Sequence, residues 1–331
     1  MRQTVQIADL SVDLHAAPRR TAGIAGLGTA LPELRVGNEQ LAAALGLADG
    51  WIERRTGIVE RRQAAPGERV VDLALRAAQA ALSDAKLDAA ELDLVLVATL
   101  AADEITPATA PLLAHALGCN ETAAIDIGAA CAGSISGIAL GSAWIESGRA
   151  RNVLVVGAEI LSRFVNREDR RTAHLFGDGA GAIVLCAGGP GCIGPILLDS
   201  DGGGADLIRA TREVGLLEMD GHETFLRAVN QLHLYTLRVI EAAGLALGDV
   251  DLFVYHQANA RILSAVADRL GISRGRVVDC ISHTGNTSAA SVPLALAHAR
   301  ESGALRPGMR IVLGAVGAGL VWGTAVVEWG A

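Results

Sequence analysis

The sequence lacks a membrane span and a secretion signal. No stretch reaches the roughly 18 unbroken apolar residues that a membrane span needs, because glycine, aspartate or arginine interrupts every long apolar run. The first 20 residues do not have the layout of a signal peptide. We therefore expect a cytoplasmic protein with no membrane partner, in which residues 1–20 form a short N-terminal extension.

Paired cysteine motifs and an excess of basic residues are also absent. The five cysteines include no C-x-x-C pair and no dense framework, which argues against a zinc site and against structural disulfides. Lysine and arginine number 28 against 36 aspartates and glutamates, and the net charge of −8 argues against nucleic acid as a partner. We expect reduced thiols and no metal.

Hydrophobic residues, by contrast, make up 51% of the 331-residue chain, which is enough for one large core or two fused ones. From residue 21 onward, short runs rich in valine, isoleucine and alanine alternate with longer segments rich in alanine and leucine. This alternation is typical of a mostly parallel β-sheet covered by helices. The predicted strands span residues 23–28, 92–99, 123–127, 153–157, 180–186, 252–256, 277–280 and 311–315.

Two long segments of the chain resemble each other. The run D-L-V-L-V-A at 93–98 returns in character as D-L-F-V-Y-H at 251–256. Further on, I-G-A-A-C-A-G-S-I-S-G corresponds to S-H-T-G-N-T-S-A-A-S-V at an offset of 155 residues, which aligns Cys131 with Asn286. Although identity between the copies is low, the pattern predicts an internal duplication. Its N-terminal half spans residues 21–195 and its C-terminal half spans residues 196–331.

Cys131 is the first candidate catalytic residue. It lies in A-A-C-A-G-S after a predicted buried strand, where we expect a helix to begin. The unpaired N–H groups at a helix start favour the thiolate, which is the reactive form of cysteine. The alternative for a lone cysteine is a small buried hydrophobic residue.

His256 and Asn286 complete the candidate site. His256 ends an apolar strand in V-Y-H-Q-A-N, at the sheet edge where α/β proteins place catalysts, and the alternative is a hydrogen-bonded core histidine. Asn286 lies in H-T-G-N-T-S, where an ordinary helix N-cap is the alternative. A thiol, an imidazole and an amide in one pocket would be the parts of a covalent acyl-transfer site.

Four motifs closely resemble those of the β-ketoacyl-acyl-carrier-protein synthase III family, namely A-A-C-A-G, H-Q-A-N-A-R-I, H-T-G-N-T-S-A-A-S-V-P and F-G-D-G-A-G-A. The resemblance runs from about residue 21 to the C-terminus. It implies a thiolase-like α/β fold, in which two duplicated halves give five αβαβα layers. It also implies a homodimer with residues 106–116 at the interface. No cofactor is implied, because a coenzyme A or phosphopantetheine thioester is the substrate.

The same resemblance assigns roles to the three residues. Cys131 would attack an acyl thioester, while the backbone N–H groups of Cys131 and Ala318 hold the oxyanion. His256 and Asn286 would then donate hydrogen bonds to malonyl thioester as carbon dioxide leaves. The resulting enolate would attack the acyl-cysteine.

The resemblance also indicates two binding regions. Trp51 and Arg55 lie in W-I-E-R-R-T-G-I, which is similar to the family's coenzyme A segment, and Arg170 aligns with another arginine of that site. Plain surface packing is the alternative for Trp51. Arg261 aligns with a residue that contacts the acidic carrier protein, whereas a solvated helix arginine is the alternative.

Four positions depart from the family's usual residues: Thr106, Leu226, Asp268 and Ala318. Leu226 and Asp268 stand where basic residues are frequent, which leaves the identity of the carrier open. Ala318 replaces a glycine but needs to supply only a backbone N–H. Thr106 replaces a bulky apolar residue at the dimer contact and would leave room for a wider acyl group.

Three functions follow from this reading. The leading interpretation is a condensing enzyme that joins an acyl group from acyl-CoA or acyl carrier protein to malonyl carrier protein, priming fatty-acid or polyketide synthesis. The first alternative is an acyltransferase that moves the acyl group from Cys131 to an alcohol or amine. The second alternative is an inactive partner subunit. The presence of His256 and Asn286 favours the condensing enzyme, because decarboxylation needs both donors.

Overall fold

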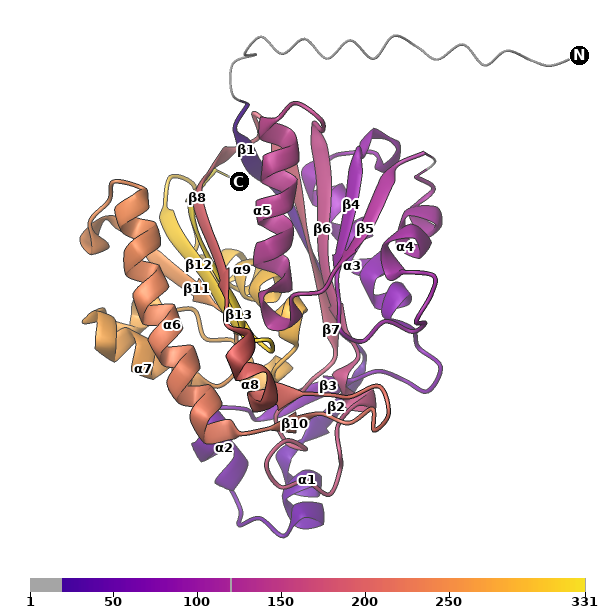
Figure 1. Ribbon diagram of the computed structural model, residues 1–331, viewed down its shortest axis with the longest axis vertical. Coiled ribbons are helices and arrows are strands. Elements are labelled where there is room, and N and C mark those ends of the chain that lie inside the picture. The colour runs from indigo at the N-terminus through magenta and orange to yellow at the C-terminus, as the bar shows by residue number, and fades with distance from the viewer. Residues whose placement is uncertain (1–19, 120, 331) are drawn as a thin grey trace, which may run out of the picture.

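The structure is a computed structural model that describes residues 20–119 and 121–330. The predicted extension at residues 1–20 lies outside the described residues except for Arg20. Two β-sheets and three layers of helices make up the body of the molecule (Figure 1). A smaller group of elements lies beside one end of the body and comprises β2 (Leu34–Gly37), α1 (Asn38–Leu45), α2 (Trp51–Thr56) and β3 (Glu60–Gln63).

The first sheet has five strands in the order β1 (Ala22–Ala30), β7 (Gly179–Ala187), β6 (Asn152–Glu159), β4 (Leu94–Ala98) and β5 (Ala123–Ile127). Strands β6, β4 and β5 run parallel, whereas β7 is antiparallel to both of its neighbours. The run L-V-L-V-A of β4 is buried throughout, as expected for a central strand with helices on both faces. The sheet is therefore mixed, whereas the sequence had predicted a mostly parallel sheet.

The second sheet repeats this arrangement with the order β11 (Leu252–Tyr255), β12 (Arg310–Gly317), β13 (Val321–Trp329) and β8 (Gly191–Ser200). Strands β11 and β12 are parallel, and β13 is antiparallel to both of its neighbours. In the first sheet, β4 and β6 are parallel in the same way, and β7 is antiparallel to both of its neighbours. Val277 forms a parallel bridge with Phe253 of β11, at the place where the first sheet has β5. The duplicated topology predicted from the sequence is confirmed.

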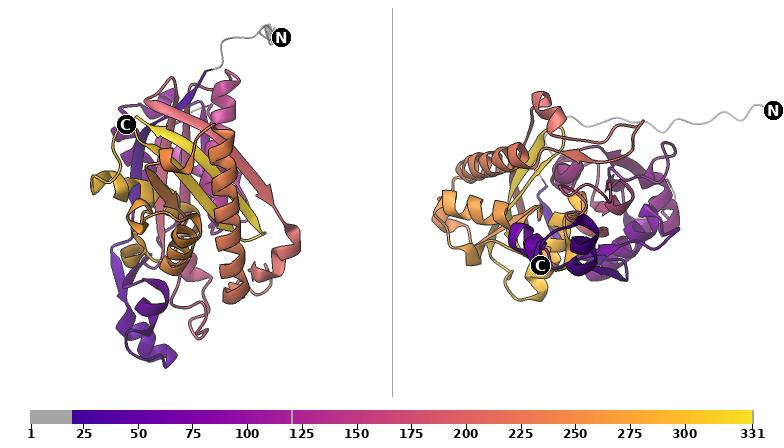
Figure 2. Two further views of the ribbon diagram at one scale, coloured as in Figure 1. Left: turned by 90° about the vertical axis from the view of Figure 1, so that its left-hand side faces the viewer. Right: turned by 90° about the horizontal axis from the view of Figure 1, so that it is seen from below.

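Helices complete five layers. Helices α3 (Val70–Ala85) and α4 (Thr109–Leu117) cover the outer face of the first sheet. Helix α6 (Gly221–Ala242) covers the outer face of the second sheet, and α7 (Ala260–Leu270) packs on α6. Between the sheets lie α5 (Gly133–Glu146) and α9 (Ser291–Glu301), as Figures 1 and 2 show. The middle helices form a buried apolar cluster with both sheets. The predicted αβαβα fold is thus confirmed, and its centre is a pair of helix starts.

The equivalence of the two middle helices corrects the predicted alignment of the halves. Helix α5 follows the 3-10 turn η2 (Ala130–Ala132), and α9 follows the 3-10 turn η7 (Ser288–Ala290). These starts are 158 residues apart, so Cys131 corresponds to Ala289 and not to Asn286. The offset of 155 holds only at the helix ends, because α9 has 11 residues and α5 has 14.

Three further predictions differ from the structure. The strand expected at 277–280 does not form, because the Gln257 side chain donates to the Val278 carbonyl and accepts from the Cys280 N–H in place of a neighbouring strand. Strands β8 and β13 were not predicted. In β8, the glycines and proline of G-C-I-G-P are typical of a loop. The sheets change between β7 and β8, so the expected boundary after residue 195 falls within β8.

Candidate active site

Cys131 lies in η2, immediately before α5 begins. The preceding residue, Ala130, has a φ of 42°, a left-handed conformation that alanine rarely adopts. Gly317 at the end of β12 packs directly against this turn, since a Cβ built on it would lie 2.7 Å from the Cys131 nitrogen. The absence of a side chain at Gly317 therefore makes room for the backbone of Cys131.

Asn286 lies just before the opposite helix start. Its Oδ1 accepts a hydrogen bond of 2.9 Å from the Ser288 N–H, and its own N–H donates to the Leu175 carbonyl at 2.9 Å. This bond fixes which end of the amide is the oxygen. The other end, Nδ2, is the hydrogen-bond donor that can serve a ligand. Ser288 has a φ of 46°, so the turn repeats the strained geometry of η2.

His256 follows β11 and is only 4% exposed. Its backbone N–H donates to the Gly314 carbonyl at 2.8 Å, which extends the pairing of β11 with β12 and fixes where the side chain leaves the sheet. Burial lowers the pKa of His256 to about 4. The imidazole is therefore neutral at pH 7, with one N–H donor and one acceptor nitrogen.

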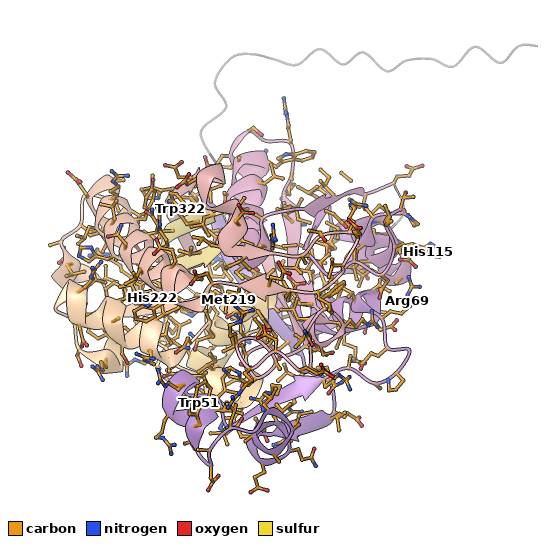
Figure 3. All side chains as sticks on the ribbon, turned by 60° about the horizontal axis from the view of Figure 1, so that its bottom comes forward. Trp51, Arg69, His115, Met219, His222 and Trp322 are labelled. Carbon is orange, nitrogen blue, oxygen red and sulfur yellow. The ribbon has the colours of Figure 1, made fainter. Side chains whose placement is uncertain are left out.

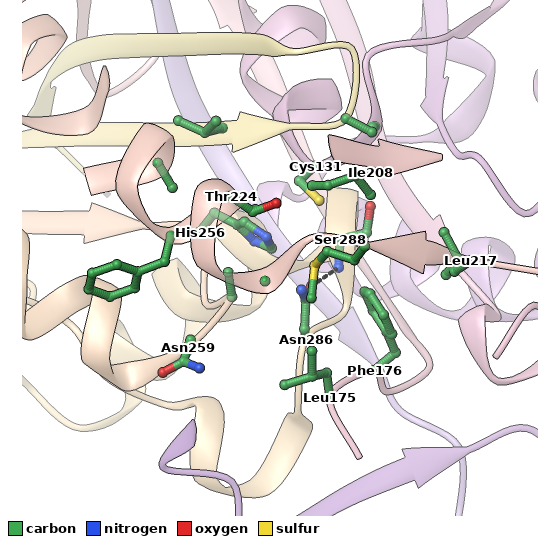
Figure 4. A pocket seen from close by; sticks show the side chains of 18 of the residues that line it. Cys131, Leu175, Phe176, Ile208, Leu217, Thr224, His256, Asn259, Asn286 and Ser288 are labelled. Atoms are coloured by element: carbon green, nitrogen blue, oxygen red, sulfur yellow. Dashed lines mark hydrogen bonds between the residues drawn. The ribbon is translucent and has the colours of Figure 1, made fainter. Parts of the chain in front are cut away.

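The three candidate residues face one cavity of about 830 Å³ (Figure 4). Ala318 lines the same cavity beside Cys131, and Arg55 and Arg261 line it as well. Much of the remaining wall is apolar and is formed by Leu161, Leu175, Phe176, Ile208, Leu217 and Met219. The arrangement places a nucleophile, two hydrogen-bond donors and a hydrophobic surface around a single space.

The resting state of Cys131 differs from the expected thiolate. The pKa of the Cys131 thiol is raised to about 11, mainly by burial and to a smaller extent by the nearby Glu159 carboxyl. The Ser288 hydroxyl and the backbone N–H of Cys131 lower it by a smaller amount. Desolvation thus outweighs the helix start, and Cys131 is a protonated thiol at neutral pH. A proton acceptor is needed when it reacts.

Of the three residues expected to bind coenzyme A, only Arg55 lines this cavity. The Arg55 guanidinium is 5.6 Å from the centre of the Trp51 ring. The Trp51 and His174 rings pack edge to face, with their centres 5.3 Å apart. Arg170 donates to the Gly46 carbonyl at 2.8 Å, next to the same small group of elements. Trp51 does not line the cavity itself and lies on α2, partly exposed (Figure 3).

A buried arginine attaches this group to the body of the protein. Arg61 on β3 donates to the Val36 carbonyl, to Asn38 Oδ1 and to the His174 carbonyl, each at 2.9 Å. Burial lowers the pKa of Arg61 to about 10, so the guanidinium still carries its charge at neutral pH. Its contacts hold β2, the start of α1 and the loop of His174 in one arrangement.

Arg261, the expected carrier contact, lies at the start of α7. Its guanidinium is 5.8 Å from the centre of the Phe225 ring and its side chain is exposed. Arg261 is therefore available at the mouth of the cavity. The departures at Leu226 and Asp268 are exposed too, and Asp268 pairs with Arg274 at 2.9 Å.

Two polar residues at the centre were missed from the sequence. Glu159 ends β6 and is fully buried, and Ser288 lies beside Cys131 in the wall of the cavity. The signal for Glu159 was a single charged residue directly after the apolar run V-L-V-V-G-A. Within residues 20–119 and 121–330, no cluster of side chains could hold a metal ion and no helix is long and apolar enough to cross a membrane.

Comparison with known proteins identifies the family. Residues 125–202 match the model of 3-oxoacyl-[acyl-carrier-protein] synthase III, and residues 240–329 match that of its C-terminal part. A β-ketoacyl-[acyl-carrier-protein] synthase III of Streptomyces coelicolor is 45% identical, over 94% of this chain and 98% of its own length. The corresponding protein of Rhodospirillum rubrum is also 45% identical, over 92% of this chain and 98% of its own.

Solved structures agree with this assignment. The 3-oxoacyl-(acyl carrier protein) synthase III of Pseudomonas aeruginosa superimposes with a TM-score of 0.90 at 43% identity, covering 94% of this chain and 99% of its own. A priming β-ketosynthase of a polyketide biosynthetic pathway gives a TM-score of 0.90 at 36% identity, covering 96% and 99%. This chain therefore belongs to the 3-oxoacyl-[acyl-carrier-protein] synthase III family of the thiolase superfamily.

Proposed function

We propose that the chain is a condensing enzyme that joins an acyl group to malonyl carrier protein, with Cys131, His256 and Asn286 as its catalytic residues. One observation carries this proposal. A thiol, a neutral imidazole and an amide oriented to donate converge on one largely apolar cavity. Such a set supports both covalent acyl transfer and stabilisation of an enolate.

In the first step, the Cys131 sulfur attacks the carbonyl carbon of an acyl thioester and loses its proton. The negative charge moves to the carbonyl oxygen, where we assign the backbone N–H groups of Cys131 and Ala318 as donors. The carbon–sulfur bond of the donor thioester then breaks, and the donor sulfur leaves as a thiolate. Acyl-Cys131 remains in the cavity.

In the second step, malonyl thioester loses carbon dioxide and becomes an enolate. Neutral His256 donates from a ring N–H and Asn286 donates from Nδ2, so both stabilise the developing charge without a competing anion. Preorganised donors of this kind are worth about 3 kcal/mol each when the site excludes water. The enolate carbon attacks acyl-Cys131, forms the new carbon–carbon bond and releases the cysteine sulfur.

The cavity wall supports an aliphatic primer. Leu161, Phe176 and Leu217 present only hydrocarbon surface, which favours an alkyl chain over a polar acyl group. For the donor, we assign Trp51, Arg55 and Arg170 to coenzyme A, because an aromatic ring and guanidinium groups suit a purine and phosphates. We assign Arg261 to contact with the acidic carrier protein.

We further propose a homodimer in the cytoplasm, with residues 106–116 at the interface. Two exposed apolar side chains support this surface. Ile105 is 84% exposed, and Ile125 of the edge strand β5 is 40% exposed. An uncovered sheet edge with apolar neighbours is a common site of association between copies.

The function is tested by measuring the intact mass of the protein after incubation with a panel of acyl-CoAs, followed by malonyl carrier protein. Wild-type protein should gain one acyl group and then discharge it into a β-ketoacyl carrier product, whereas Cys131→Ala should gain none. A stable acyl-enzyme that releases no carbon dioxide from malonyl thioester and discharges only to an alcohol or amine would show an acyltransferase. Failure of every acyl-CoA and acyl-carrier donor to load Cys131 would indicate an inactive subunit.

A further inference from the structure

A buried carboxyl group lies directly behind the nucleophile. Glu159 has no exposed surface, and its carboxyl accepts hydrogen bonds from the Leu100 N–H at 3.1 Å, the Thr99 hydroxyl at 3.3 Å and the Ala289 N–H at 3.5 Å. These donors are all neutral. A carboxylate in such a place is costly, because burial without a cationic partner disfavours its charge.

Ser288 lies between this carboxyl and Cys131. Its hydroxyl is close enough to lower the pKa of both the Cys131 thiol and the Glu159 carboxyl, although it forms a well-aligned hydrogen bond to neither. Ser288 has a left-handed backbone, is almost fully buried and lines the cavity beside Cys131. Gly157 on β6 allows η7 to come this close, since a Cβ there would collide with the Ala289 carbonyl.

We propose that Glu159 stores the proton of Cys131 during the catalytic cycle, with Ser288 passing it between them. When Cys131 attacks the thioester, its S–H bond breaks and the proton moves to the Ser288 oxygen, while the Ser288 hydroxyl proton moves to a Glu159 oxygen. The donor thiol leaves as a thiolate and takes a proton from water. When condensation expels the Cys131 sulfur, the same two transfers run in reverse. This inference rests on the proposed function.

The chemistry of the second step favours the same role. While Cys131 is acylated, Glu159 would be a neutral acid, so no anion would lie behind the site as the malonyl carboxylate and the enolate bind. Burial raises the pKa of Glu159 to about 7, so both of its forms are populated near neutral pH. The groups that face the carboxyl are the Cys131 thiol from η2, Thr99 and Leu100 after β4, and Ser288 and Ala289 from η7.

The test measures the rate of acylation of Cys131 by acetyl-CoA, by rapid quench and intact mass, between pH 5 and 9. The variants are Glu159→Gln and Ser288→Ala, with Ser134→Ala as the matched control. Ser134 is another buried hydroxyl at the same helix starts, but it donates to the Ala289 carbonyl and not to the relay. Thermal unfolding of each variant reports whether it is folded.

The wild-type rate should rise with pH through an inflection near 7. Loss of the relay should slow acylation at least tenfold in Glu159→Gln and in Ser288→Ala, as expected for a lost acid–base group, and should remove the inflection. The double variant should be no slower than either single one, and Ser134→Ala should follow the wild type.

The opposite result is equally clear. If Glu159 acts only through its charge, its removal lowers the pKa of Cys131, and Glu159→Gln acylates as fast as the wild type or faster. That outcome overturns the relay while leaving the proposed function intact. If Glu159→Gln does not fold, Ser288→Ala decides alone, and a wild-type rate and pH profile in that variant reject the proposal. Wild-type protein that is never acylated contradicts the proposed function itself.

Discussion

Gly317 should control the reactivity of Cys131 although it contributes no side chain. In Gly317→Ala, the new Cβ would lie 2.7 Å from the Cys131 nitrogen, 3.2 Å from the Ala132 nitrogen and 3.3 Å from the Ala129 carbonyl oxygen, where ordinary contact begins at 3.4 Å. All three are backbone atoms, so no flexible side chain can move aside. The turn that carries the nucleophile must shift by the missing 0.7 Å.

A shift of this size has a predictable cost. Misplacement of a reacting group by about 1 Å can reduce a rate about 100-fold, so we expect Gly317→Ala to lower the acylation rate by about 10- to 100-fold. That corresponds to about 1.4 to 2.7 kcal/mol of transition-state stabilisation. The overpacking itself should reduce the free energy of unfolding by about 1 to 3 kcal/mol.

Rapid-quench acylation with acetyl-CoA measures the first effect, and denaturant unfolding measures the second. Gly141→Ala is a suitable control, because its Cβ would also be crowded, at 3.0 Å from side chains of Val153 and Leu185, but two turns along α5 from the site. It should alter stability and leave acylation within about twofold of the wild type. Acylation of Gly317→Ala at the wild-type rate would refute the idea that this contact positions Cys131.

Three other perturbations test separate parts of the structure. Because burial lowers the pKa of His256 to about 4, release of carbon dioxide from malonyl thioester should keep its histidine-dependent rate from pH 8 to 5 and fall only towards pH 4. The unfolded chain binds more protons than the folded one between pH 6.5 and 4, so this histidine should also reduce stability as the pH falls through that range, which denaturant titrations at several pH values would reveal. Trp51→Ala should raise the KM for acyl-CoA about tenfold with little change in kcat, since stacking on a base is worth about 1 to 3 kcal/mol; an unchanged KM would remove Trp51 from the binding site. Arg61→Ala should lower the free energy of unfolding by about 3 kcal/mol, because one buried and two partly buried acceptors lose a charged donor, and a stability equal to that of the wild type would contradict this role.

The sequence correctly predicted which residues lie together in the cavity, but not how the two halves of the chain align around it. Cys131, His256 and Asn286 each lie in a distinctive motif, and all three line one space. The repeat pattern suggested that Cys131 and Asn286 were equivalent. The same run E-S-G ends both middle helices, at 146–148 and 301–303, and this identity concealed a difference of three residues in helix length. A sequence alignment cannot place a gap inside a helix when the two copies share so few residues.

The parts that escaped prediction depend on contacts between distant segments. The Gln257 side chain replaces a strand partner for residues 278 and 280, which no local propensity can indicate. The ionisation of Cys131 was expected from its helix start alone, whereas burial decides that the thiol stays protonated. Glu159 itself is brought to Cys131 only by the packing of β6 against the two helix starts.

The position of Gly317 also determines when the enzyme can become active during synthesis. The turn around Cys131 is shaped by a strand whose last residue follows 186 positions later in the chain. At the usual rate of translation of about 5 to 20 residues per second, the nucleophile waits roughly 10 to 40 s for the segment that positions it. Partly synthesised chains therefore carry Cys131 without the strand that packs against its turn, and the observed geometry of this turn appears only once residue 317 has emerged.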